Sequence, residues 1–128
     1  MPLDQLSAIL ACAILAGLTI FQAALIGGAP LGRMAWGGQH DVLPARLRIG
    51  SAASIGLYAL FAYAALAKAG LAPPLLGESF TSISMWVLTA YFTLGIVLNL
   101  ISRSKAERLI MTPTVLILAA LYLVLSLH

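Results

Sequence analysis

The stretch 5–28, QLSAILACAILAGLTIFQAALIGG, decides the fold. It contains no charged side chain, and a helix of about 20 apolar residues is long enough to cross the roughly 30 Å hydrocarbon core of a bilayer. Gly27, Gly28 and Pro30 favour a helix end here, because Gly leaves helical geometry easily and Pro lacks a backbone donor. Asp4 precedes the apolar run and no Lys or Arg does, so we expect a retained span rather than a cleaved signal peptide.

Three further stretches have the same character, at 46–69, 81–101 and 105–127. No charged residue lies in the middle of any of them, and no apolar–polar alternation indicates a β-barrel. Pro113 should kink the last helix or separate a short interfacial turn from a shorter span. We therefore predict an all-α membrane protein, a four-transmembrane-helix bundle, formed as a single domain by residues 1–128.

The composition agrees with a bilayer environment. Hydrophobic residues make up 62% of the 128 residues and charged residues 9%, whereas a soluble domain has about 25% charged residues. The net charge of +3 comes from basic residues that gather at span ends. We therefore expect membrane lipids as partners and no binding to nucleic acid.

The basic residues are divided unequally between the two ends of the predicted bundle. Six lie in or beside the first and third connections: Arg33, Arg46, Arg48, Arg103, Lys105 and Arg108. The opposite end has Lys68 alone. Because cytoplasmic loops carry the excess of Lys and Arg, this bias predicts the orientation of the multi-pass protein. Its first and third connections would face the cytoplasm, and both termini would lie outside.

Small residues four apart recur in the first two spans. The pairs are Ala13/Gly17, Gly50/Ser54 and Ala52/Gly56. Such faces let helix backbones approach closely in lipid, where the hydrophobic effect adds little to helix association. We expect them to pack the bundle internally, and a homo-oligomer formed through the same faces is the alternative.

Two polar clusters fall at the predicted cytoplasmic end. The first connection carries Arg33, Trp36, His40 and Asp41, and the third region carries Asn99, Arg103, Glu107 and Arg108. Because the topology places both on one side, we consider them together as a cytoplasmic mouth that binds a lipid headgroup or another anion. The alternative is structural, with Trp36 as an interfacial anchor and Ser104 and Glu107 at capping-box spacing.

Among the polar residues within the spans, four are candidates for an intramembrane site, namely Gln22, Thr19, Tyr58 and Tyr91. An amide in hydrocarbon is costly unless it finds a hydrogen-bond partner. Gln22 and Asn99 lie at similar predicted depths, so we expect them to contact each other, with Thr19 nearby. A pocket for water or a ligand at this depth is the alternative.

Catalytic signals are weak. Histidine is a common general acid or base, and Asp41 could orient the ring of His40 or act as a base, so a membrane enzyme using this loop stays open as an alternative. No nucleotide-binding, metalloprotease or hydrolase motif occurs, and we expect no enzyme. Cys12 is the only cysteine, and His40 and His128 fall at opposite ends, so the sequence predicts no metal or other cofactor.

Several short motifs together resemble an uncharacterised family of small four-span bacterial inner-membrane proteins. They are Gly28-x-Pro30-x-Gly32, Trp36-Gly37-Gly38, Leu43-Pro44, Arg46-Leu47-Arg48, Leu98-Asn99, Ser102-Arg103-Ser104, Glu107-Arg108 and Pro113. The resemblance covers nearly the whole chain. It implies a bacterial inner-membrane location and implies no activity.

These observations lead to one main expectation about function. We expect a non-catalytic membrane bundle that binds a lipid, an apolar small molecule or a protein partner. A small oligomeric channel or transporter is the first alternative, and it predicts a polar seam through Gln22, Thr89, Thr93 and Asn99.

Overall fold

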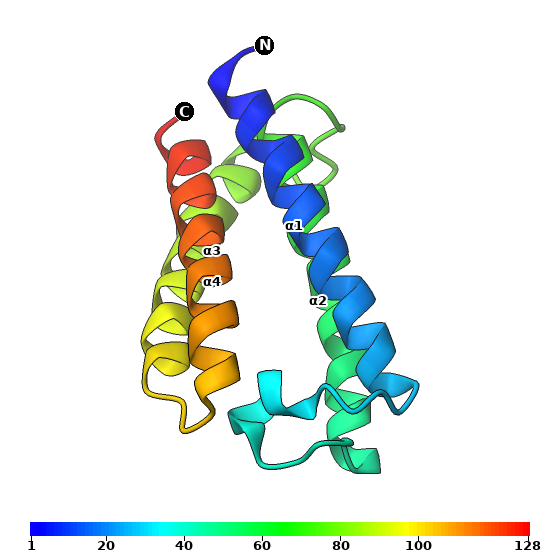
Figure 1. Cartoon of the computed structure of the whole chain (residues 1–128). Helices are drawn as coiled ribbons and strands as arrows, with labels where there is room; N and C mark the ends of the chain where they lie inside the picture. The colour runs from blue at the N-terminus through cyan, green and yellow to red at the C-terminus, as the bar shows by residue number, and fades with distance from the viewer.

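Four long helices account for most of the chain in the computed structural model, which describes all residues from 1 to 128. They are α1 (Leu3–Ile26), α2 (Ala45–Lys68), α3 (Glu78–Leu100) and α4 (Lys105–Leu127), and no strand is present (Figure 1). Each is long and apolar enough to cross a membrane. The predicted four-transmembrane-helix bundle is therefore confirmed, and the chain is a multi-pass membrane protein.

The helix boundaries follow the local chemistry closely. Gly28 has φ +93°, a left-handed conformation in which Gly carries no Cβ penalty, just after α1. Pro44 directly precedes α2, and the backbone N–H of Glu107 donates to Ser104 Oγ at 3.3 Å at the start of α4. The reciprocal half of the capping box is absent, because the Glu107 carboxylate accepts from Ser102 Oγ at 2.9 Å instead. α4 runs without a break through Pro113, so no separate interfacial turn forms.

The helices form two pairs that lean apart. α1 packs mainly on α2, and α3 mainly on α4. The pairs meet near the two termini and diverge toward the first and third connections (Figure 1). The main core lies where they meet, and its buried members are Ala8, Ala11, Leu15, Ala65, Ala69, Met85, Leu88, Phe92, Leu118, Ala119, Tyr122 and Leu125.

Tyr122 joins the two pairs within this core. Its side chain is fully buried, and its hydroxyl donates to the backbone carbonyl of Phe61 at 2.6 Å. Its ring lies 5.1 Å from that of Phe92, and the Phe92 ring lies 5.7 Å from that of Phe61, centroid to centroid. These aromatic contacts fill the space between α2, α3 and α4, so the core is closed across the bundle at this level.

Two of the three small-residue pairs do not pack the bundle as predicted, whereas Gly50 of the third pair lies against the Trp36 ring. Ala13, Gly17, Ala52 and Gly56 are exposed on the outer faces of α1 and α2. The close helix contact lies instead at Gly95 on α3, where an added Cβ would stand 3.0 Å from Val115 Cγ1 on α4. The spacing of small residues gave a wrong prediction here, because small residues four apart mark a smooth helix face and do not indicate which neighbour covers it.

We predict that Gly95→Leu lowers the thermal unfolding midpoint of the protein in detergent, because the larger side chain forces α3 from α4; overpacking of this kind costs about 1–3 kcal/mol. The matched control is Gly17→Leu, also mid-helix, where an added Cβ meets nothing within 4 Å. An equal loss of stability in both variants would contradict the assignment. A loss confined to Gly17→Leu, together with a loss of dimer, would instead favour an oligomer contact on α1.

A folded loop closes the diverging end of the bundle. We call residues 27–44 the floor loop, and it contains two short 3-10 turns, η1 (Gly32–Met34) and η2 (Trp36–Gly38). The Trp36 ring lies over Gly50 of α2, and its Nε1 donates to Ser51 Oγ at 3.3 Å. On the other side the Ser104 hydroxyl donates to the backbone carbonyl of Arg33. The floor loop thus attaches α2 to the corner before α4.

Gly38 permits the second of these attachments. It has φ +72°, and a Cβ there would overlap Ser104 Cβ. We predict that Gly38→Ala lowers the unfolding midpoint more than Gly37→Ala. Gly37 has φ +79° with nothing within 4 Å, so Ala there bears only the left-handed backbone cost of about 1–2 kcal/mol. Equal effects of the two variants, measured side by side in detergent, would contradict a close contact at Gly38.

Candidate binding cavity

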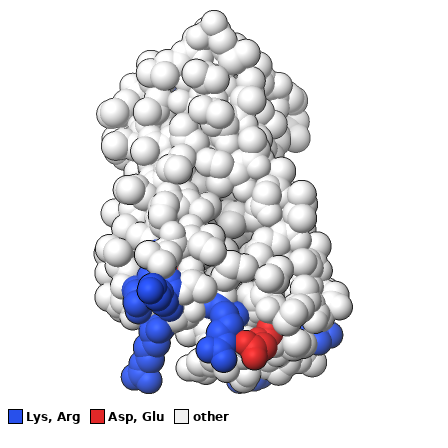
Figure 2. Space-filling view, in the orientation of Figure 1, with Lys and Arg blue, Asp and Glu red and all other residues white.

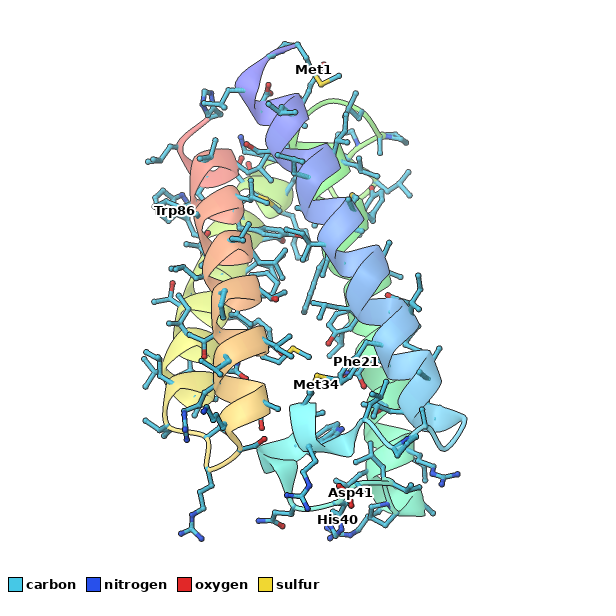
Figure 3. The ribbon with its side chains drawn as sticks, viewed as in Figure 1. Met1, Phe21, Met34, His40, Asp41 and Trp86 are labelled. Carbon is cyan, nitrogen blue, oxygen red and sulfur yellow. The ribbon has the colours of Figure 1, made fainter.

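A cavity of about 370 Å³ lies between the two helix pairs, below the main core and above the floor loop. Figure 3 shows Met34 pointing up from the floor loop into this space beside Phe21 of α1. The lining residues are Leu18, Phe21, Gln22, Met34, Ala35, Trp36, Ser54, Tyr58, Tyr91, Phe92, Leu94, Gly95, Leu98, Asn99, Glu107, Met111, Val115 and Leu118. Its size and its mostly apolar wall are typical of small-molecule sites.

Gln22 is the most informative residue of the wall. Its side chain is 7% exposed, and its Nε2 donates to the Tyr58 hydroxyl at 3.3 Å. Its Oε1 is buried and has no hydrogen-bond partner. A buried acceptor without a partner costs about 1–3 kcal/mol relative to a paired one. The wall therefore contains one polar atom that the chain itself leaves unsatisfied.

Asn99 lines the same cavity from α3, but the predicted contact between Gln22 and Asn99 is wrong. Asn99 Nδ2 donates to the backbone carbonyl of Gly95 at 2.7 Å, one turn earlier on its own helix. Gln22 takes Tyr58 of α2 as its partner instead. The two amides share a depth, as predicted, but they lie on helix pairs that have already separated at this level, and the cavity occupies the space between them.

Glu107 is the one charged residue of the wall, and it reaches the cavity from the first turn of α4. Six of the predicted site residues thus meet at one cavity: Trp36, Asn99, Glu107, Gln22, Tyr58 and Tyr91. They come from the floor loop and all four helices. Residues predicted for the cytoplasmic clusters and residues predicted within the spans therefore line the same cavity, an arrangement that the sequence does not indicate.

The remaining charged candidates lie outside the cavity. Arg33 Nε donates to Asp41 Oδ1 at 2.7 Å, and this pair is on the surface, with side chains 68% and 64% exposed. The hydrogen bond and the charge of Asp41 raise the pKa of Arg33. An exposed pair of this kind contributes little to stability. Asp41 therefore pairs with Arg33 rather than orienting His40, and Figure 3 shows both His40 and Asp41 below the floor loop, pointing away from the cavity.

Arg103 and Arg108 also lie outside the lining. Arg103 is exposed, and Arg108 Nη1 donates to the backbone carbonyl of Ser102 at 2.7 Å. Thr19 donates to the Leu15 carbonyl of its own helix at 2.8 Å. Figure 2 shows Lys and Arg side chains only at the floor-loop end of this face. The basic residues thus surround the end of the bundle, while the cavity wall above them contains none.

Several wall residues were not expected from the sequence. Phe21, Met34, Phe92 and Met111 line the cavity and carry no pattern that separates them from ordinary core residues. Met34 offered the only available signal, as a large apolar side chain within a loop rich in glycine and polar residues. No group of three His, Cys, Asp or Glu side chains lies close enough together to hold a metal ion.

The polar seam expected of a channel is not continuous. Thr93 is exposed and donates to the Thr89 carbonyl at 2.7 Å, and Thr89 pairs with Ser126 of α4 at 3.1 Å. Neither lines the cavity, and the packed core with Tyr122 separates the cavity from the opposite end of the bundle. Within one chain, the cavity is therefore closed toward the end that holds the termini.

Two other hollows lie on the outside of the molecule. One, of about 630 Å³, borders the second connection between Lys68 and Glu78 and is open. The other, of about 430 Å³, is an almost wholly apolar groove between α2 and α3. Neither contains a buried polar atom without a partner. The cavity above the floor loop is smaller than both, but only there do buried polar groups converge.

We predict different outcomes for two substitutions at the Gln22–Tyr58 contact. Gln22→Leu removes the unpaired oxygen and leaves only the Tyr58 hydroxyl without its partner, so the unfolding midpoint of the ligand-free protein in detergent should change little. Tyr58→Phe removes the same bond and leaves Nε2 unpaired as well, so it should destabilise by about 1 kcal/mol. A larger loss for Gln22→Leu than for Tyr58→Phe would show that Gln22 Oε1 has a partner within the chain.

Comparison with known proteins adds no relative to this picture: no family model, no curated protein and no solved structure matches the chain. The geometry of the cavity is therefore the basis on which a function can be proposed.

Proposed function

We propose that the protein binds a small amphipathic molecule, a lipid or another apolar compound with a polar group, in the cavity above the floor loop. The observation that carries this proposal is Gln22 Oε1, a buried acceptor without a partner on a residue that lines the cavity. An occupant with a hydrogen-bond donor would satisfy it. The apolar remainder of such an occupant would lie against Leu18, Leu98 and Met111.

The exposed part of the wall supports entry from the bilayer. Tyr91, Leu94 and Leu98 of α3 line the cavity and are 52%, 58% and 56% exposed. All three lie within a helix that is apolar enough to span the membrane. An apolar molecule dissolved in the surrounding lipid would thus reach the cavity sideways, without crossing the charged end of the bundle.

A quenching experiment tests occupancy directly. Trp36 lines the cavity and Trp86 does not, so Trp86→Phe leaves a single tryptophan reporter in the wall. In phosphatidylcholine nanodiscs, a brominated octanol should quench Trp36 saturably, because the bromine comes to rest beside the ring. Ser54→Phe should abolish the saturable part by filling the cavity.

The matched control is Ser84→Phe. Ser54 and Ser84 each donate to the carbonyl four residues earlier, at 3.0 and 2.8 Å, but Ser84 lines the outer groove between α2 and α3. Ser84→Phe should keep the saturable quenching. If quenching rises linearly with the quencher concentration, and equally in both variants, the quencher only partitions into the lipid. That result would contradict the proposal.

We further propose that the cavity lies toward the cytoplasm in a bacterial inner membrane. Six of the seven basic residues lie at its end of the bundle, and the distribution of Lys and Arg orients membrane proteins. The resemblance of the short motifs to those of small bacterial inner-membrane proteins favours the same location.

Cysteine labelling checks this orientation. In a Cys12→Ser background, we predict that a membrane-impermeant maleimide labels His128→Cys in intact spheroplasts. It should label Lys105→Cys only after the membrane is permeabilised, because α4 separates the two positions across the bilayer. Labelling of Lys105→Cys alone in intact spheroplasts would reverse the orientation, and labelling of both would contradict a spanning α4.

A further inference from the structure

The donors and acceptors of the cavity wall differ in whether they are already bonded within the chain. The N–H groups of the wall side chains Gln22, Asn99 and Trp36 donate to Tyr58, to the Gly95 carbonyl and to Ser51. The Ser54 hydroxyl likewise donates to its own helix, at the Gly50 carbonyl. These donors bond within the chain, whereas the oxygen of Gln22 is left free. The wall therefore has a free amide acceptor, which matches an occupant that donates, beside the hydroxyls of Tyr58 and Tyr91, which can donate or accept.

The charge of the wall also favours an occupant that donates hydrogen bonds. Glu107 is its only ionisable acidic or basic side chain, and none of the basic residues at this end lines the cavity. Ser102 Oγ donates to one carboxylate oxygen, Oε2, at 2.9 Å, and no chain donor is bonded to the other. In a site of low dielectric constant a carboxylate attracts a cation strongly and repels an anion. The neighbouring Arg108 does not neutralise it by direct contact, since its Nη1 is held by the Ser102 carbonyl.

Aromatic rings complete the pattern. Phe21, Trp36, Tyr58, Tyr91 and Phe92 line the cavity from α1, the floor loop, α2 and α3. Ring faces attract cations, and cages of aromatic side chains are the usual way in which proteins recognise organic ammonium groups. Tyr91 and Phe92 lie edge to face at 5.4 Å, so their rings are held at 70° to each other in the upper wall. Several rings, one carboxylate and one free amide oxygen thus border a single space.

We infer that the occupant is a lipophilic organic ammonium, a protonated amine with an apolar tail. This inference rests on the proposed function, because it specifies the chemistry of the molecule in the same cavity. The Glu107 carboxylate supplies the opposite charge, the Gln22 amide supplies an acceptor in the same wall, and aromatic side chains line the space beside them. The tail lies among the leucine and methionine side chains.

The test uses the Trp86→Phe protein in nanodiscs of zwitterionic phosphatidylcholine, with Trp36 fluorescence as the readout. Octylammonium, octanol and octanoate have the same tail and differ in the head. We expect saturable binding of octylammonium, weaker binding of octanol and none of octanoate. Glu107→Gln should weaken octylammonium binding by about tenfold or more, equal to roughly 1.4 kcal/mol, and should leave octanol binding unchanged.

The matched control is Glu78→Gln, which neutralises the corresponding carboxylate in the first turn of α3, at the other end of the bundle. It should leave octylammonium affinity unchanged. Gln can still accept the Ser102 hydrogen bond, so Glu107→Gln should keep the unfolding midpoint of the parent protein; if it does not, Gln22→Leu, which should also weaken octylammonium binding, replaces it.

The outcomes separate the two proposals. Equal saturable binding of octanol and octylammonium, unaffected by Glu107→Gln, would overturn the ammonium inference and leave the proposed function standing. Preferred binding of octanoate would also overturn it and would point to the basic residues as the recognition groups. No saturable binding of any of the three would overturn both.

Discussion

Hydrocarbon allows no unpaired polar group without a cost, and this constraint governs the whole molecule. It requires helices for each span, and it requires each polar side chain within a span to find a partner. Thr19, Thr89 and Thr93 meet the requirement on their own helices. Tyr122 meets it by bonding across to α2. Gln22 Oε1 is the exception in the cavity wall, and for that reason it identifies the site better than any sequence motif does.

Much of the architecture was predictable from the sequence, because membrane spans are set by a single physical quantity. Apolar length located all four helices, with the largest difference at the start of the third, where the helix begins at Glu78 rather than at residue 81. The end of the first helix and the cap of the fourth followed from Gly and Ser, whose local conformations do not depend on distant neighbours.

The site was predictable only in part, because it depends on how far apart two helix pairs stand. Sequence reasoning selected Gln22 and Asn99 as residues that need partners, and both line the cavity. The sequence favours a direct contact between Gln22 and Asn99, because residue number indicates how deep each side chain lies in its span. It does not indicate how far apart the two helices stand. The sequence also favours His40 and Asp41 as site residues because of their chemistry. In the structure the floor loop places these two side chains toward the surface. It places Met34 and Trp36 in the cavity wall. The direction of each loop side chain follows from η1 and η2, which no periodic pattern indicates.

The floor loop has a consequence for how such a protein changes over time. Its side chains form one wall of an intramembrane cavity, yet the segment that carries them is not itself a span. Substitutions at Met34 or Ala35 therefore reshape the compartment without altering the hydrophobicity that inserts the four helices. A lineage of these proteins can acquire new preferences through a short extramembrane segment, while the parts recognised by the insertion machinery stay constant.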